Sequence, residues 1–221
     1  MSNRQKPNKP TGETGPTLIS FGPQGVKSEF QQLAFPKQKE AVEALIIQGF
    51  LRTAGALLPF HIESCTPNQQ DDFDFSLTTS AGPKNVELAE VALLDNQTPS
   101  YRAAPASYKP YDFAQRVLDL ILSKSAHYAQ RPPTGLHLLL YITHWAFIPS
   151  ESALKLLQFW TLKRAHGFEG VYWYAPIASQ DGIPFLIYPT PSEQWSTFDP
   201  ESFRSSEVHN LNPRGWVPGS H

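Results

Sequence analysis

Hydrophobic and polar positions follow two rhythms along the chain, and these rhythms predict where its helices and strands lie. Apolar residues at helical spacing predict three helices, over residues 36–51, 111–130 and 149–166. Short apolar or alternating runs predict six strands, over residues 57–65, 73–79, 86–94, 135–143, 170–175 and 183–188. The run over 73–79 has the clearest period of two, because its apolar residues alternate strictly with polar ones.

The order of these elements predicts an α/β fold with a mixed central sheet and helices packed on it. The first helix is followed by three strands that short turns can join into an antiparallel meander. A helix then leads to the fourth strand, and such a crossover normally joins parallel strands. We expect this core to form one domain over residues 29–190, with the first helix ending near Gly49.

The two ends of the chain lack a periodic pattern. Residues 1–28 are rich in Pro, Gly, Lys, Asn and Thr, and they predict a flexible N-terminal tail. Residues 191–221 are rich in Pro and Ser and predict an irregular C-terminal extension. The segment 95–110 contains three prolines and predicts a long loop that serves as a lid, a rim or an interaction segment.

Composition narrows the function classes. The chain has 221 residues, of which 40% are hydrophobic, so it can bury a substantial core. Its formal net charge of −2 argues against an abundant non-specific DNA-binding protein, although a local basic patch remains compatible with it. Cys65 is the only cysteine, which excludes an internal disulfide and a Cys-rich zinc site. Without a signal-peptide pattern or a long apolar run, the expected location is the cytoplasm, away from membranes.

Two acids on neighbouring predicted strands are the strongest candidates for chemistry. Asp74 lies on the polar face of its strand, and Glu90 lies inside an apolar run, where an ionised carboxylate is costly unless it is compensated. Two such carboxylates can bind Mg²⁺ through oxygen ligands. Glu87 is the alternative acid if the strand has the other register, but the sequence favours Glu90 because it lies deeper in the apolar run.

A lysine on the second predicted helix is the third candidate. Lys124 falls on the apolar stripe that should face the sheet, so it either extends outward to water or has a buried anionic partner. Asp74 and Glu90 are its natural partners if the helix packs over their strands. Glu40 or Glu43 on the first helix could add a third carboxylate, although a solvent-exposed helix face is the more common arrangement for such residues.

These residues and the order of elements over 36–145 resemble the PD-(D/E)XK (restriction endonuclease-like) nuclease superfamily. The tripeptide F-D-F around Asp74 is similar to the family's P-D element. Sixteen residues later, E-V-A from Glu90 is similar to E-x-K, with Ala92 in place of Lys. The helix segment ILSKSAHY and the strand LHLLLYIT resemble the elements that follow. The resemblance implies a metal site at Asp74 and Glu90, with Lys124 as a catalytic lysine that has moved to the helix.

Two functions of different classes follow from this resemblance. The first is a Mg²⁺-dependent phosphodiesterase that acts on DNA or RNA, with Asp74, Glu90 and Lys124 as catalytic residues. The second is an inactive nuclease fold that needs no cofactor and binds a protein or nucleic acid, or forms a homo-oligomer, through its aromatic-rich second half. That half carries Trp145, Trp160, Tyr172, Trp173 and Tyr174. Ala92 and the low net charge favour the scaffold, and the inward position of Lys124 favours the enzyme.

Overall fold

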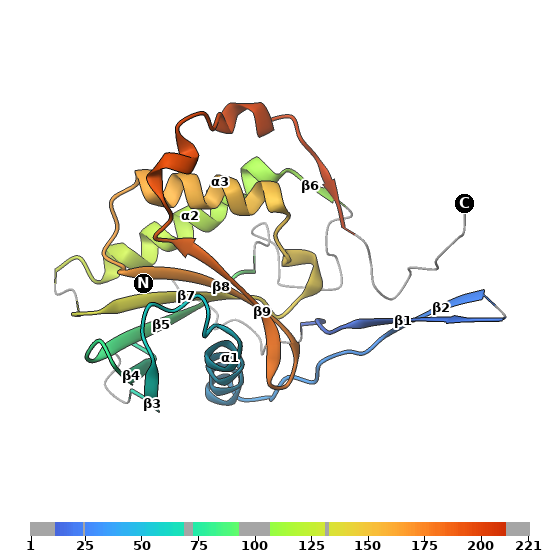
Figure 1. Cartoon of the computed structure of the whole chain (residues 1–221), viewed down its shortest axis with the longest axis horizontal. Helices are drawn as coiled ribbons and strands as arrows, with labels where there is room; N and C mark the ends of the chain where they lie inside the picture. Colours follow the sequence, from blue (N-terminus) through green and yellow to red (C-terminus); the bar gives the residue numbers. More distant parts are fainter. Residues whose placement is uncertain (1–11, 24, 69–72, 93–106, 131–132, 211–221) are drawn as a thin grey trace, which may run out of the picture.

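A six-stranded sheet forms the centre of the molecule, and helices cover both of its faces (Figure 1). The computed structural model describes residues 12–23, 25–68, 73–92, 107–130 and 133–210. The strands of the sheet, in spatial order, are β3 (Ile62–Pro67), β4 (Phe75–Thr79), β5 (Lys84–Glu90), β7 (Leu136–Tyr141), β8 (Gly170–Ala178) and β9 (Asp181–Tyr188). Helix α1 (Lys39–Thr53) lies on one face, and α2 (Pro110–His127) and α3 (Glu151–Lys163) lie on the other.

The strand directions confirm the mixed α/β sheet predicted from the sequence. Strands β3, β4 and β5 form an antiparallel meander. The chain then crosses through α2 to β7, which runs parallel to β5, and through α3 to β8, which runs parallel to β7. Strand β9 returns antiparallel to β8. Helical crossovers account for the parallel pairs because parallel neighbours cannot be joined by a tight turn.

Two separate hydrophobic cores lie on the two faces of the central sheet, and strands β5, β7, β8 and β9 contribute to both of them. On β5, Val86 and Leu88 pack into the core under α1, whereas Ala89 and Val91 pack into the core under α2 and α3. Successive side chains of a strand point to opposite faces, and this alternation decides which face each polar residue of β5 reaches. Of the five aromatic residues of the second half named above, three are buried in these cores, namely Tyr172, Trp173 and Tyr174.

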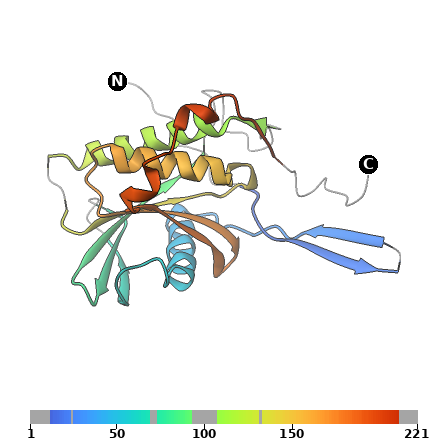
Figure 2. The same cartoon turned by 45° about the horizontal axis from the view of Figure 1, so that its top comes forward.

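The segment expected to be part of a flexible N-terminal tail contains a hairpin instead. Strands β1 (Thr17–Gly22) and β2 (Gly25–Phe30) pair antiparallel and project away from the body of the molecule (Figures 1 and 2). The sequence-based interpretation relied on the Pro and Gly content, but two of these glycines flank the turn, and Gly25 has a φ of 106°. Residues 1–11 lie outside the described residues.

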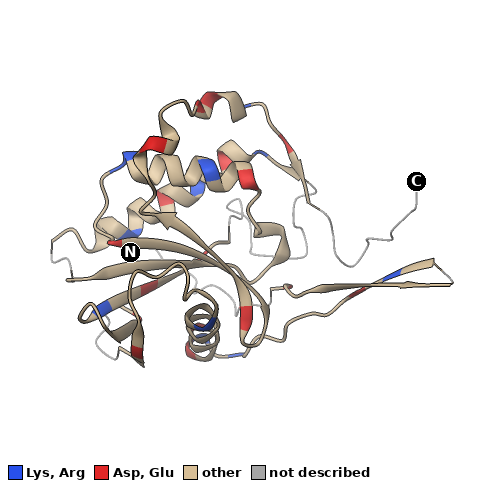
Figure 3. Ribbon diagram, in the orientation of Figure 1, with Lys and Arg blue, Asp and Glu red and all other residues tan. Residues whose placement is uncertain are grey.

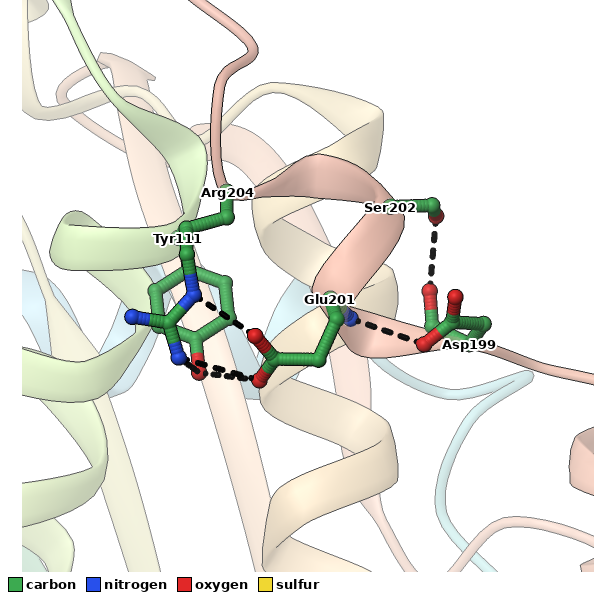
Figure 4. A network of polar contacts seen from close by, with 5 residues as sticks. All are labelled: Tyr111, Asp199, Glu201, Ser202 and Arg204. Atoms are coloured by element: carbon green, nitrogen blue, oxygen red, sulfur yellow. Dashed lines mark hydrogen bonds and ion pairs between the residues drawn. The ribbon is translucent and has the colours of Figure 1, made fainter.

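The C-terminal extension is irregular, as expected, but it is attached to α2. Its elements are the 3-10 helices η3 (Ser192–Trp195) and η4 (Pro200–Phe203), and the strand β10 (Val208–His209), which pairs with β6 (Ser107–Tyr108). The Arg204 guanidinium lies 4.6 Å from the centre of the Tyr111 ring, and both side chains donate hydrogen bonds to the Glu201 carboxylate (Figure 4). Residues 211–221 and 93–106, the latter including 95–106 of the expected loop, lie outside the described residues.

The helices begin and end within three residues of the predicted bounds, but the role expected for one glycine differs. Ser150 caps α3 as predicted, since its Oγ accepts a hydrogen bond from the Ala153 N–H at 3.3 Å. The prediction that Gly49 ends the first helix is wrong, because α1 continues to Thr53. Gly49 is required for packing: a Cβ atom at this position would lie 2.2 Å from the Tyr174 hydroxyl oxygen. A further short 3-10 helix, η2, spans Trp145–Phe147. Within the described ranges, no helix is long and apolar enough to cross a membrane.

We expect Gly49→Ala to destabilise the protein, although alanine is the better helix former. The helix propensity gain is about 1 kcal/mol, and the overpacking against Tyr174 costs about 1–3 kcal/mol with a midpoint near ~2, so the expected net loss is about 1 kcal/mol. Chemical denaturation measures it. The matched control is Gly55→Ala, because a Cβ atom there meets nothing within 4 Å. Adding Tyr174→Phe to Gly49→Ala should restore part of the stability, and a Gly49→Ala protein as stable as wild type contradicts this account.

Candidate functional site

Glu87 is the centre of a buried polar network between β5 and α2. Its Oε1 accepts a hydrogen bond from Lys124 Nζ at 2.5 Å, and its Oε2 accepts one from the Tyr128 hydroxyl at 2.6 Å. Lys124 and Tyr128 are four residues apart near the end of α2, so both can reach the same point of the sheet. Glu87 is only 8% exposed, and these two partners compensate a carboxylate that would otherwise be buried alone.

Asp74 lies immediately before β4, and its carboxylate is bound to the neighbouring strand β5. Its Oδ2 accepts a hydrogen bond from the Leu88 N–H at 2.7 Å. Burial raises the pKa of Asp74 from 3.8 to about 6, against the opposing effect of that hydrogen bond. The negative charges of Glu87 and Glu43 raise the pKa further, and the positive charge of Lys39 lowers it. The structure therefore brings Asp74 into the electrostatic field of Glu87 and of the first turns of α1.

Helix α1 supplies a second lysine–glutamate pair close to these acids. Lys39 Nζ and Glu43 Oε1 are 3.0 Å apart, and Glu43 is buried while Glu40 is exposed. Their hydrogen bond raises the pKa of Lys39, and the charges of Asp74 and Glu87 act on Lys39 in the same direction. The expectation of a solvent-exposed face is therefore correct for Glu40 and wrong for Glu43. The i,i+4 spacing of Lys39 and Glu43 was a visible signal for this pair.

The structure separates Glu90 from Lys124, although the sequence favours Glu90 over Glu87. Glu90 is three residues beyond Glu87 on β5, so it lies on the opposite face, the face that α1 covers. There its Oε1 accepts a hydrogen bond from the Thr143 hydroxyl at 2.5 Å, beyond the end of β7. Lys124 has Glu87 as its ion-pair partner in place of the expected Asp74 and Glu90. The register with Glu87 as the acid, which was the alternative in the sequence analysis, therefore matches the surroundings of Lys124 better than the preferred register with Glu90.

The donor set around Asp74 and Glu87 is compatible with a hard divalent cation. Both side chains offer carboxylate oxygens, and Asp74 has a raised pKa partly because a second negative charge is close to it, a condition that a cation would relieve. In the described part of the chain, no group of three or more His, Cys, Asp or Glu side chains is arranged to hold a metal ion. Two carboxylates suffice for Mg²⁺, since this ion usually keeps several water ligands.

His137 on β7 is a second buried titratable group, on the face of the sheet that packs against α1. It is 5% exposed, and neither ring nitrogen has a hydrogen-bond partner. Burial is the main cause that lowers its pKa to about 4. Its ring packs against the rings of Phe60 and Tyr172, and this aromatic packing indicates a structural role for His137. Neutral His137 favours the folded state above pH 6.5, and this contribution is lost as the pH falls towards 4.

We expect Asp74→Asn to stabilise the protein at pH 7 but not at pH 4. The folded-state pKa of Asp74 is raised, so its carboxyl group favours folding below pH 3.8 and loses that contribution as the pH rises through 6. The stability of the variant relative to wild type should therefore grow across this window by about 1–2 kcal/mol, since the carboxylate is partly exposed to water. Urea denaturation of both proteins at pH 4, 5, 6 and 7 measures the difference, in which the opposite effect of His137 cancels. A difference independent of pH, or one that shrinks from pH 4 to pH 7, contradicts this assignment.

Comparison with known proteins gives no match: no family model, no curated protein and no solved structure is significantly similar to this chain. The resemblance to the PD-(D/E)XK nucleases therefore remains an inference from its residues and element order.

Proposed function

We propose that this chain is a Mg²⁺-dependent phosphodiesterase that acts on a nucleic acid, with Asp74, Glu87 and Lys124 as its catalytic residues. The observation that supports the proposal is the ion pair between Lys124 and Glu87, close enough to Asp74 for the Glu87 charge to raise the pKa of Asp74. Two acids on neighbouring strands and a lysine form the set that the sequence resemblance implies. Glu87 takes the place that the sequence gives to Glu90.

The proposed roles follow from burial and charge. Lys124 is one-third exposed, so its ammonium group can contact Glu87 and still reach a phosphate that approaches from solvent. There it would stabilise the negative charge that develops during cleavage. Ala89, two residues after Glu87 and on the same face, stands where the resemblance expects a lysine in this register, and Lys124 would replace that lysine from α2. Asp74 and Glu87 would bind Mg²⁺, which supplies a Lewis acid when bound.

A non-catalytic scaffold is the second candidate, and one observation favours it. Both carboxylate oxygens of Glu87 already accept hydrogen bonds, from Lys124 and Tyr128, as in a pair whose role is structural. Acidic and basic residues are also interspersed on α2 and α3, so neither helix offers a surface of one sign to nucleic acid (Figure 3). In this alternative, the network holds α2 on the sheet and the protein binds its partner elsewhere.

A cleavage assay separates the two candidates. The wild-type protein should cut labelled single- or double-stranded DNA or RNA with Mg²⁺ or Mn²⁺ present, and EDTA should stop the reaction. Asp74→Asn, Glu87→Gln and Lys124→Met should each lower the rate by about 100-fold or more, because each removes a charge that acts on the reacting phosphate. Lys84→Met is the matched control, since Lys84, on β5, likewise pairs with a glutamate, Glu169, at 2.7 Å but lies away from Asp74 and Glu87 in the pairing.

Glu90→Gln tests the choice between the two acids. If Glu87 is the functional one, Glu90→Gln should cut at nearly the wild-type rate, and thermal melts should show that all variants are folded. Loss of cutting in Glu90→Gln with retention in Glu87→Gln would restore the register that the sequence favours. A wild-type protein that is inert on every substrate with both metals rejects the enzyme and leaves the scaffold.

A further inference from the structure

Both carboxylate oxygens of Glu87 are occupied, and this restricts how a cation can bind to it. Oε1 accepts a hydrogen bond from the Lys124 ammonium group at 2.5 Å, and Oε2 accepts one from the Tyr128 hydroxyl at 2.6 Å. A divalent cation needs a carboxylate oxygen of Glu87 as a ligand. One of the two donors therefore has to make room for it, and the surroundings of the two donors indicate which one.

Tyr128 is the donor that can stay in place. It is 7% exposed and belongs to the core under α2 and α3, so packing fixes the position of its ring. Its hydroxyl group is neutral, and each oxygen of a carboxylate has two lone pairs, so its hydrogen bond to Oε2 is compatible with a cation at Glu87. Tyr128 thus holds the Glu87 carboxylate in one orientation before and after a cation binds.

Lys124 is the donor that has to leave. Its ammonium group carries a positive charge, which repels a divalent cation at the same carboxylate. The Lys124 side chain is 34% exposed, whereas that of Glu87 is only 10% exposed, so the lysine lies on the solvent side of the pair. Its flexible four-carbon stem allows the ammonium group to turn into water while the backbone of α2 stays where it is.

The charges around the acids couple the release of Lys124 to cation binding. Three carboxylates and two ammonium groups act on one another here, namely Asp74, Glu87 and Glu43 with Lys39 and Lys124. The carboxylates exceed the ammonium groups by one while Lys124 is on Glu87, and by two when it turns away. A divalent cation compensates this excess of negative charge, so its binding and the release of Lys124 favour each other.

We propose that Lys124 and a divalent cation exclude each other at Glu87, so that Lys124 blocks the site until cation binding releases it towards an approaching phosphate. This inference rests on the proposed function, because it concerns the same acids and the same lysine. It gives Lys124 two positions, the observed one on Glu87 and a second one in which the ammonium group faces solvent. The lysine then contributes to phosphate binding only after the cation is in place, so the cation binds first and the substrate second.

The first test measures Mn²⁺ binding to the full-length protein by electron paramagnetic resonance, which needs no substrate and no cleavage. Lys124→Met should lower the dissociation constant by about 10-fold, because the ion no longer has to displace an ion pair or bind beside a like charge. Lys84→Met is the matched control: it removes an equal charge whose partner is Glu169, so it should bind like wild type. Tyr128→Phe removes a donor from Glu87 but no charge, so its dissociation constant should not fall.

Glu87→Gln separates this inference from the function on which it rests. It should bind Mn²⁺ far more weakly than wild type, because it lacks a charged ligand. If it does, and Lys124→Met binds no more tightly than wild type, the inference is overturned while the metal site stands. An equal gain in Lys124→Met and Tyr128→Phe also overturns it, because the lysine charge is then not what excludes the ion. If Glu87→Gln binds like wild type, or if wild type and Lys124→Met both fail to bind, the metal site fails and the inference fails with it.

The second test follows Lys124 in the wild-type protein, so it does not depend on the folding of a lysine variant. Acetylation with limiting reagent, measured at each lysine by mass spectrometry, reports how readily an ammonium group leaves its partner. Saturating Mn²⁺ should raise the rate at Lys124 several-fold and leave the rate at Lys84 unchanged, since Lys84 is paired with Glu169. In Glu87→Gln, Lys124 should react quickly with and without Mn²⁺. A Lys124 rate in wild type that saturating Mn²⁺ does not change overturns the inference.

Discussion

A carboxylate in the middle of an apolar strand is the constraint on which this structure depends. Glu87 is flanked on β5 by buried apolar residues and is itself buried, so the fold must provide it with donors. Lys124 and Tyr128 do so from one end of α2, which fixes the position of that helix over the sheet. Apolar side chains could fill the same space at lower cost, because the attraction between buried charges rarely exceeds their desolvation. The presence of a charged group there agrees with a role for its charge, which is the basis of the proposed active site.

The order of the elements could be predicted from the sequence because period and length are local properties. An alternating run such as 73–79 and the apolar stripe of α2 need no knowledge of distant residues. The acid of the site could not be chosen in this way. Glu87 and Glu90 are three residues apart, so one must face α2 and the other α1, and only the packing of the helices decides which. Depth in the apolar run pointed to Glu90, but β5 ends at Glu90 and Glu87 lies well inside it.

Two glycine-containing segments show that local composition predicts the wrong structure where contacts with other parts of the chain determine it. Gly49 has the local appearance of a helix end, yet its missing side chain makes room for Tyr174, a residue 125 positions further along the chain. The hairpin over 17–30 resembles a tail because Gly and Pro surround it, although the short apolar run that contains Leu18, Ile19 and Phe21 is present in the sequence. The structure at Gly49 is decided by a residue far along the chain, and the hairpin has no described partner beside its exposed side chains. A short stretch of sequence contains neither fact.

The two acids of β5 support different parts of the molecule. Glu87 faces α2 and the site, while Glu90 meets Thr143, whose carbonyl oxygen lies against Gly12 so closely that a Cβ atom there would be 1.9 Å away. The same N-terminal segment is held by the Thr14 hydroxyl, which donates to the Pro176 carbonyl at 3.0 Å, and by the Trp145 N–H, which donates to the Glu13 carbonyl at 2.7 Å. This segment is the root of the β1–β2 hairpin. Glu90 therefore supports the segment that anchors the hairpin, and Glu87 the site proposed for catalysis, so that loss of Glu90 should affect the hairpin anchor without directly removing the site.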